Sequence, residues 1–139
     1  MKKIFYTISF FIILSACTKY SNIPISEAYL YKGKNKLVSV EFVVQSSYAL
    51  IPGNYYRLFS TPSFMDKNAF AVQFPVGKAF KRLGIESDSS HDKFLAIKAC
   101  YNGKLIRVKG KIESIMFSSI PAECPAIVLD DPSDISILD

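Results

Sequence analysis

Hydrophobic and polar residues alternate with a period of two along much of this chain. In residues 38–45, VSVEFVVQ, every second side chain is apolar, and the alternation recurs in AFAVQFPV at 69–76 and KLIRVKGKIESI at 104–115. This pattern is typical of β-strands that bury one face, although Pro75 must stand at a strand end or a sheet edge. We expect further short strands at 28–31 (AYLY), 94–101 (FLAIKACY), 125–129 (PAIVL) and 134–138 (DISIL).

Turn-forming residues divide these segments. Asn102-Gly103 stands between 94–101 and 104–115, and this dipeptide predicts a tight hairpin because both residues tolerate positive φ. Reversals are also expected at residues 52–54 (PGN) and 33–36 (GKNK). Residues 78–83 have the pattern of a short helix, with Gly84 as the C-terminal stop.

Gly110 interrupts an otherwise regular strand, and a glycine inside a strand marks a bulge or a sharp bend. Five to seven strands, one short helix and a bent strand predict an all-β domain, built as a small antiparallel barrel or sandwich. GKLIRVKGKIES (103–114) and AIVLDD (126–131) resemble a strand pair of oligonucleotide/oligosaccharide-binding (OB) folds. The resemblance implies a barrel shape and no particular function, since this fold hosts many functions.

The first sixteen residues have the organisation of an export signal. Lys2 and Lys3 form a positive end, residues 4–14 carry no charge, and the small residues Ser15 and Ala16 follow. At about 1.5 Å per residue, the apolar run would span about half of a bilayer core, which is too short for a transmembrane helix. The segment therefore predicts a secretory signal peptide.

Leu14-Ser15-Ala16-Cys17 resembles the lipobox of bacterial lipoproteins, which is Leu, a small residue, Ala or Gly, and then Cys. The resemblance implies that Cys17 carries a diacylglyceryl lipid and becomes the mature N-terminus after cleavage. It divides the chain into a signal peptide at 1–16, a lipidated tether at 17–26 and a single β-rich domain at 27–139. Thr18 implies the outer membrane if the host is Gram-negative. The alternative is an ordinary secreted protein with a cysteine among its first mature residues.

Composition agrees with a small exported domain. Removing residues 1–16 leaves 123 residues with 15 basic and 12 acidic side chains, a net charge of +3. This balance suits an anionic membrane surface but does not by itself indicate nucleic-acid binding. Export places Cys100 and Cys124 in an oxidising compartment, so we expect a disulfide between them. A catalytic thiol would need a basic partner, and His91 is the one histidine of the sequence.

Each motif with candidate chemistry has an ordinary structural explanation. SDSSHD (87–92) places Ser, His and Asp together, but the members of a catalytic triad converge from separate parts of a fold, so a solvated loop is favoured. DDPSD (130–134) lacks the glycine and terminal glutamate of a calcium loop and is expected to be a turn. Arg107, Lys109 and Lys111 share one strand face, for which we favour solvent exposure, or contact with anionic lipid or a partner protein, over nucleic acid.

These patterns indicate no catalytic residues, cofactor or metal site. We therefore expect a non-enzymatic envelope lipoprotein, anchored in the membrane through Cys17, that binds or scaffolds an envelope protein or glycan and not nucleic acid. One alternative is an inhibitor of a secreted hydrolase. The other is a glycan-processing enzyme that uses carboxylates such as Glu41, Glu86 or Asp88.

Overall fold

The structure is a computed structural model in which residues 19–50, 54–117 and 120–138 are described, without the side chains of 120–122. Its elements, in chain order, are β1 (Ser21–Ile23), the 3-10 helix η1 (Ile25–Tyr31), β2 (Leu37–Val43), β3 (Ser46–Leu50), β4 (Tyr55–Phe59), β5 (Ala71–Pro75), α1 (Val76–Leu83), α2 (Ser90–Tyr101), β6 (Leu105–Phe117), β7 (Ile120–Val128), the 3-10 helix η2 (Pro132–Asp134) and β8 (Ile135–Leu138).

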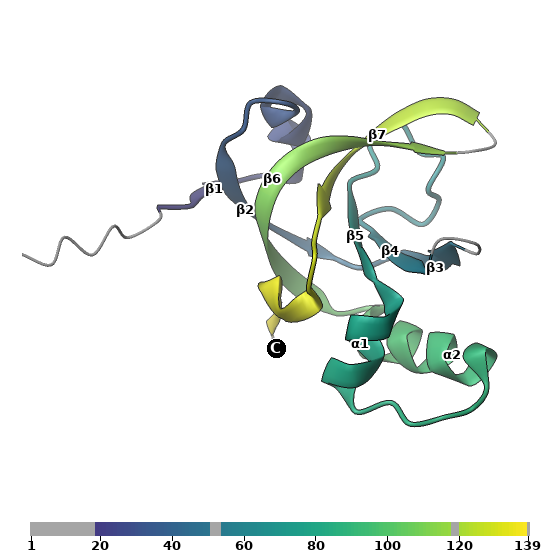
Figure 1. Cartoon of the computed structure of the whole chain (residues 1–139). Coiled ribbons are helices and arrows are strands. Elements are labelled where there is room, and N and C mark those ends of the chain that lie inside the picture. The colour runs from purple at the N-terminus through teal and green to yellow at the C-terminus, as the bar shows by residue number, and fades with distance from the viewer. Residues whose placement is uncertain (1–18, 51–53, 118–119, 139) are drawn as a thin grey trace, which may run out of the picture.

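The strands form one strongly curled sheet (Figure 1). Its order is β1-β2-β6-β7-β5-β4-β3, and β8 adds to β6. The pairs β1–β2 and β5–β7 are parallel and the remaining pairs are antiparallel. Because β2 leads into β3 through Val44 and Gln45, the edge strand β3 is almost continuous with β2, the second strand from the other end of the curled sheet, as in a small, partly open barrel. The predicted all-β, OB-like fold is confirmed, with a mixed rather than purely antiparallel sheet.

β6 is the longest strand and bends around the barrel. Its first half pairs with β2 and its second half with β7. Gly110 lies at the change of partner, where an added Cβ would be 2.6 Å from Cγ2 of Ile127. The strand register is regular at Gly110, and the irregularity in β6 lies between Met116 and Phe117 instead. Glycine at position 110 has a packing reason, since an added Cβ would meet the Ile127 side chain.

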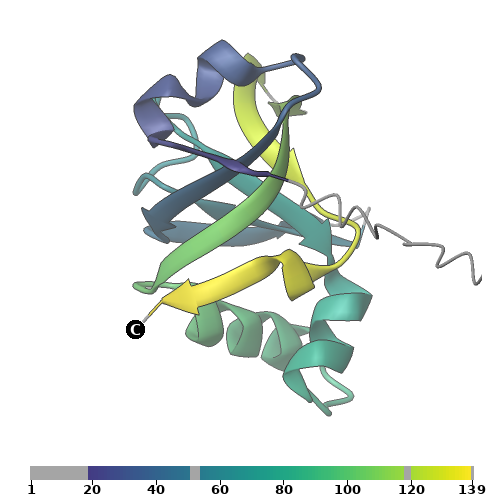
Figure 2. The same cartoon turned by 90° about the vertical axis from the view of Figure 1, so that its left-hand side faces the viewer.

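Two apolar clusters form the interior. The larger one fills the barrel and continues to the helices, with members such as Val40, Phe74, Ile97 and Ile106. Helices α1 and α2 lie together at one end of the barrel, as two perpendicular views show (Figures 1 and 2). The smaller cluster includes Phe59, Phe117 and Cys124.

The predicted helix and its stop are confirmed. Residues 78–83 belong to α1, Ala79 is fully buried, and Gly84 has φ +63°, the left-handed conformation typical of a helix end. Pro75 is the last residue of β5 and the N-cap of α1, as its missing N–H requires. The predicted reversal at 52–54 lies largely outside the described residues, although β3 and β4 pair on either side of it, with Leu50 opposite Tyr55.

Two strand predictions were wrong. Residues 94–101 belong to α2, so Asn102-Gly103 joins a helix to β6 rather than closing a hairpin. Phe94, Ile97 and Tyr101 follow helical spacing and pack into the core, and burial along one helical face outweighed the apparent alternation. Residues 28–31 lie in η1 and not in a strand. The described chain thus has two α-helices and two 3-10 helices where one short helix was expected.

The folded part extends into the segment predicted as a tether. Within 17–26, β1 pairs in parallel with β2, and the Ile23 side chain is buried. The predicted signal peptide at 1–16 and Cys17 lie outside the described residues. No helix in the described part of the chain is long and apolar enough to cross a membrane.

Candidate functional site

An aromatic cluster lies on the outer side of the sheet formed by β3, β4 and β5. It belongs to the smaller apolar cluster, whose buried members include Phe59, Phe117 and Cys124, with Tyr48 and Phe64 packed against them. The Tyr48 ring stacks on Phe59 with centroids 5.3 Å apart, and Phe64 lies 5.3 Å from both Tyr48 and Phe117. Strand alternation explains the second cluster, because neighbours such as Tyr56 and Leu58 point into the barrel instead.

Arg57 stands in the middle of this outer face and is only 6% exposed. Strand register places Tyr48 on β3 and Gln73 on β5 directly opposite it. Arg57 Nε donates a hydrogen bond to Gln73 Oε1 at 2.7 Å, Nη1 donates to the Tyr48 hydroxyl at 3.2 Å, and the guanidinium lies 5.5 Å from the Phe117 ring centre.

The guanidinium of Arg57 has no carboxylate partner within the described residues. An arginine has five N–H donors, and the two bonds to Gln73 and Tyr48 use two of them. Within the described residues, Nη2 has no hydrogen-bond partner. This face therefore presents a sheltered cation, without a carboxylate partner among the described residues, beside aromatic rings.

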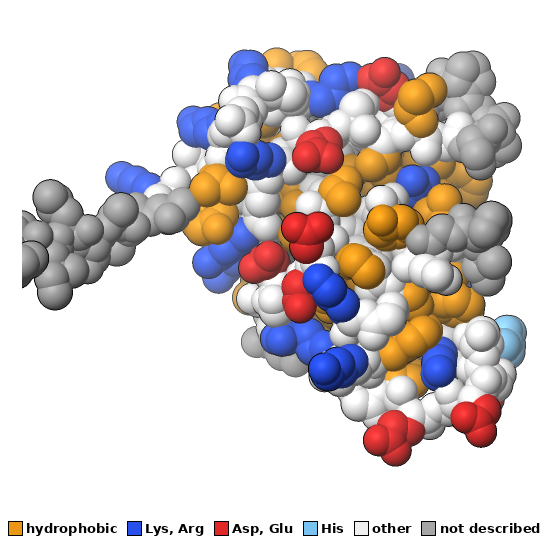
Figure 3. Space-filling view, in the orientation of Figure 1, with side chains coloured by type: hydrophobic (Ala, Val, Ile, Leu, Met, Phe, Trp, Pro, Cys, Tyr) orange, Lys and Arg blue, Asp and Glu red, His pale blue; other side chains and the backbone are white. Residues whose placement is uncertain are grey.

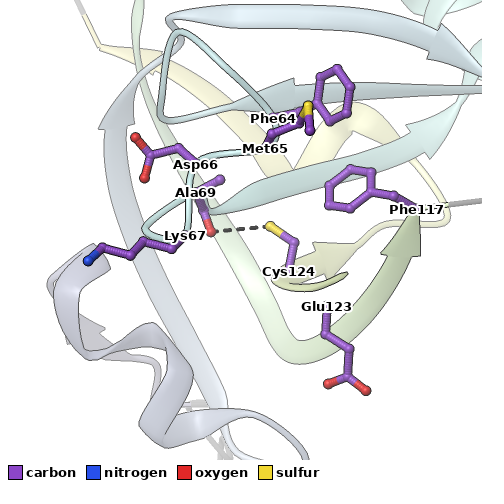
Figure 4. A pocket seen from close by; sticks show the side chains of 8 residues that line it. All are labelled: Phe64, Met65, Asp66, Lys67, Ala69, Phe117, Glu123 and Cys124. Carbon is purple, nitrogen blue, oxygen red and sulfur yellow. Dashed lines mark hydrogen bonds between the residues drawn. The ribbon is translucent and has the colours of Figure 1, made fainter. Parts of the chain in front are cut away.

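A hollow of about 360 Å³ borders the aromatic cluster (Figure 4). It is lined by residues 64–67, Ala69, Phe117, Glu123 and Cys124. Figure 4 shows the rings of Phe64 and Phe117 together on one side, while the carboxylate of Glu123 points away from the Cys124 thiol. A second hollow shares Lys67 and Ala69 with the first and reaches Tyr29 of η1, so the two adjoin.

The two carboxylates of the first hollow already have structural partners. Glu123 accepts hydrogen bonds from Lys32 Nζ at 2.6 Å and from the Ser114 hydroxyl at 2.8 Å. The bonds from Lys32 and Ser114 lower the pKa of Glu123 below its ordinary value, which disfavours Glu123 as a general acid. Asp66 Oδ1 accepts from the backbone N–H of Asn68 at 2.8 Å, as in an ordinary turn.

Both remaining cysteines are free thiols, so the predicted disulfide between Cys100 and Cys124 is not formed in the structure. Cys100 lies on α2 against the larger cluster, whereas Cys124 lies on β7 in the smaller one, and separate clusters hold them apart. The Cys124 thiol donates to the carbonyl oxygen of Ala69 at 3.2 Å. Burial raises the pKa of Cys124 to about 11, although the charge of Arg57 acts in the opposite direction.

The other motifs with candidate chemistry form ordinary local structure, and residues 90–92 of SDSSHD begin α2 instead of belonging to the expected loop. In SDSSHD, Ser89 caps α2 by accepting from the backbone N–H of Asp92 at 3.4 Å, and His91 is exposed in the first helical turn. DDPSD contains η2, where the side chain of Asp131 accepts from the Ser133 N–H and its pKa is lowered by that bond. No group of three metal-binding side chains occurs in the described part of the chain.

The three carboxylates suggested for a glycan-processing site do not meet. Glu41 on β2 forms an ion pair with Arg107 on β6. Glu86 and Asp88 are exposed in the loop between α1 and α2. Arg107 is thus part of a neutralised pair on the outer sheet face, while Lys109 lies over the Tyr20 ring.

Comparison with known proteins places the chain in no family: no family model matches, and no curated protein matches. A putative aspartyl-tRNA synthetase from Leishmania major Friedlin is 11% identical over 91% of this chain, with a TM-score of 0.48. Aspartyl tRNA synthetase from Entamoeba histolytica is 13% identical over 86%, with a TM-score of 0.45. The chain spans 22% and 21% of these two proteins.

OBody AM3L09, whose structure is bound to hen egg-white lysozyme, is 14% identical over 81% of this chain and 92% of its own, with a TM-score of 0.45. At these TM-scores the similarities identify neither a family nor a ligand. The barrel architecture rests on the strand pairing described above.

Sequence reasoning missed the site around Arg57. The signal was present in YYRLF and AVQFP, where Arg57 and Gln73 interrupt otherwise apolar strands. A polar residue at the outward position of a buried strand is ordinary, and only the strand register shows that these two face each other.

Proposed function

We propose that this protein is a lipid-anchored lipoprotein of the cell envelope whose barrel domain binds another envelope component without catalysing a reaction. The lipobox resemblance supports an anchor on Cys17, in the outer membrane if the host is Gram-negative. The binding role is carried by one observation: Arg57 is a sheltered cation that lacks a carboxylate partner in the described chain and faces aromatic side chains.

The chemistry of this face suits a partner group that carries a negative charge and also has a planar or apolar part. Burying a charge without a partner raises the free energy of the folded protein. An anionic group that pairs with the buried guanidinium removes part of this cost, so its binding is favoured. The open donors of a guanidinium fit carboxylate or phosphate oxygens in a fork. Arginine and aromatic residues also dominate the energetic centres of protein interfaces.

The adjoining hollow extends the surface for such a partner. Met65 lines it and is 63% exposed, and an exposed methionine adapts to the shape of what it contacts. Figure 3 shows hydrophobic side chains gathered over β4, β5 and β7 on the face in view. Contiguous exposed apolar surface beside polar groups is typical of an interaction site.

The test compares two methionines in the full-length chain. Met65 lines the hollow and Met116 does not, while their exposures are nearly equal at 63% and 64%. Immobilised wild-type protein is incubated with envelope extract, and captured components are identified and quantified by mass spectrometry. Met65→Glu is expected to weaken capture of the specific component by about tenfold, equivalent to ~1.4 kcal/mol. Met116→Glu is expected to bind as wild type does.

An Arg57→Gln variant tests the charge directly, with thermal unfolding as the check that the domain remains folded. It is expected to lose capture while keeping a cooperative transition. Equal capture by wild type, Met65→Glu and Arg57→Gln would move the binding site elsewhere, and no specific capture by wild type would refute binding to an extractable component.

A further inference from the structure

Five lysines gather on the side of the domain where the chain enters it. Lys109 and Lys111 are two positions apart on β6, so their exposed side chains lie on the same face of the strand. Lys34 and Lys36 lie in the turn that precedes β2, and Lys19 lies two residues before β1. We call these five residues the lysine face. Figure 3 shows Lys and Arg side chains along this edge of the molecule.

Contacts with tyrosine rings hold three of these ammonium groups. Lys109 Nζ lies 5.2 Å from the centre of the Tyr20 ring, and Lys34 and Lys36 lie 5.8 Å and 5.3 Å from the centre of the Tyr31 ring. Tyr20 is adjacent to β1, so Lys109 of β6 reaches across to the entry point of the chain. Cation–π contacts position the lysines without neutralising them.

Charge compensation is weak on this side. No lysine of the lysine face pairs with a carboxylate in the described residues. The neighbouring acids Glu41 and Glu123 are occupied by Arg107 and Lys32. Glu113, which is exposed and alternates with Lys111 on β6, is the nearest opposing charge along that strand. The lysine face thus keeps a net positive charge.

The covalent chain brings this face close to any lipid on Cys17. Four residue steps separate Cys17 from Ser21, the first residue of β1. Fully extended, four residues span at most about 14 Å, which is less than two Debye lengths of about 8 Å at physiological ionic strength. When the tether is shorter than its full extension, it therefore brings these lysines within the electrostatic range of a bilayer surface.

We infer that the lysine face docks on anionic lipid headgroups and sets the orientation of the domain on the membrane. The inference rests on the proposed lipid anchor and adds to it a surface and a lipid class. Docking in this way turns β3 and β4, which carry Tyr48 and Arg57, away from the bilayer, because they lie on the other side of the barrel from β1 (Figures 1 and 2). The Arg57 site then remains open to a partner.

The experiment uses the full-length protein, reconstituted into vesicles of phosphatidylcholine alone or of phosphatidylcholine with phosphatidylglycerol. Vesicle flotation first measures membrane attachment. An amine-acetylating reagent is then added, and modification of each lysine is quantified by mass spectrometry. Lys34, Lys36, Lys109 and Lys111 are expected to be acetylated at least about threefold more slowly on anionic vesicles, and high salt should abolish the difference.

The internal controls are Lys78, Lys81, Lys93 and Lys98 on α1 and α2, whose rates are expected to be the same on both kinds of vesicle. A matched pair of variants extends the test. Changing the four lysines of β6 and the turn to Gln is expected to remove salt-sensitive preference for anionic vesicles, and changing the four helix lysines to Gln is expected to leave it intact.

The outcomes separate the two proposals. Flotation failing on both vesicle types contradicts the lipid anchor, whatever the lysines do. Attachment with uniform acetylation on the two vesicle types overturns the lysine-face inference and leaves the anchor standing. Protection of the helix lysines instead would mean that the domain docks by its other end, which also overturns the inference.

Discussion

Replacing Gly110 by alanine should destabilise the domain through one identifiable contact. The added Cβ would lie 2.6 Å from Cγ2 of Ile127 and 3.8 Å from its Cβ and Cγ1. Carbon atoms in good contact are about 3.5–4.0 Å apart, so the closest approach is short by about 1 Å. Ile127 is fully buried and β-branched, which leaves its side chain little freedom to move aside.

We expect Gly110→Ala to lower the free energy of unfolding by about 1–3 kcal/mol, the usual range for overpacking a closely packed core. For a domain of this size, the midpoint of thermal unfolding should fall by about 4 °C for each kcal/mol. Urea and heat unfolding followed by far-UV circular dichroism measure the effect, since the chain contains no tryptophan.

Two comparisons make this prediction specific. Gly77 lies in α1 with nothing within 4 Å of an added Cβ, so Gly77→Ala should stabilise the protein by about 0.5–1 kcal/mol. In an Ile127→Ala background, which removes Cγ2, Gly110→Ala should lose most of its effect. An unchanged stability of Gly110→Ala, or an equal loss in both backgrounds, would refute the steric explanation.

Three further predictions concern the cysteines and the hollow. Cys17→Ala should prevent incorporation of labelled fatty acid and release of the mature form, and normal processing of this variant would contradict the lipobox assignment. Under non-reducing denaturation, Cys100 and Cys124 should both titrate with a thiol reagent; in the native protein at pH 8, Cys124 should react slowly, because its pKa is raised to about 11. Lys32→Gln should raise the pKa of Glu123, measured by NMR titration, towards its ordinary value of 4.5. Because the pKa of Glu123 is lower in the folded state than in the unfolded state, the Glu123 carboxylate stabilises the fold above the unfolded pKa. This stabilisation is lost as the pH falls through the folded pKa. The Lys32→Gln variant should therefore lose less stability in acid than the wild type does.

Prediction succeeded where the pattern reports on local geometry. Period-two alternation correctly located β2, β5 and β6, because neighbouring side chains of a strand must point to opposite sides whatever the strand pairs with. The helical stop at Gly84 was likewise correct, since positive φ is a local requirement.

Prediction failed where burial from distant segments decides the outcome. Residues 94–101 fit both a strand and a helix, and packing of Phe94, Ile97 and Tyr101 against the barrel selected the helix. A disulfide between Cys100 and Cys124 was expected from export and the number of cysteines. Neither feature reports the distance between the two thiols in the fold. The fold placed Cys100 and Cys124 in separate clusters.

By itself, the sequence determined the β-rich character of the domain, the helix stop at Gly84 and the expectation of a lipid on Cys17. Each of these depends on a short run of residues and on covalent or conformational chemistry that needs no distant partner. The tertiary structure alone decided that Arg57, Tyr48 and Gln73 face one another, and that lysines of β6 lie beside the entry of the chain. Strand register and sheet curvature bring together residues that lie far apart in the sequence, and no local pattern records which strands become neighbours.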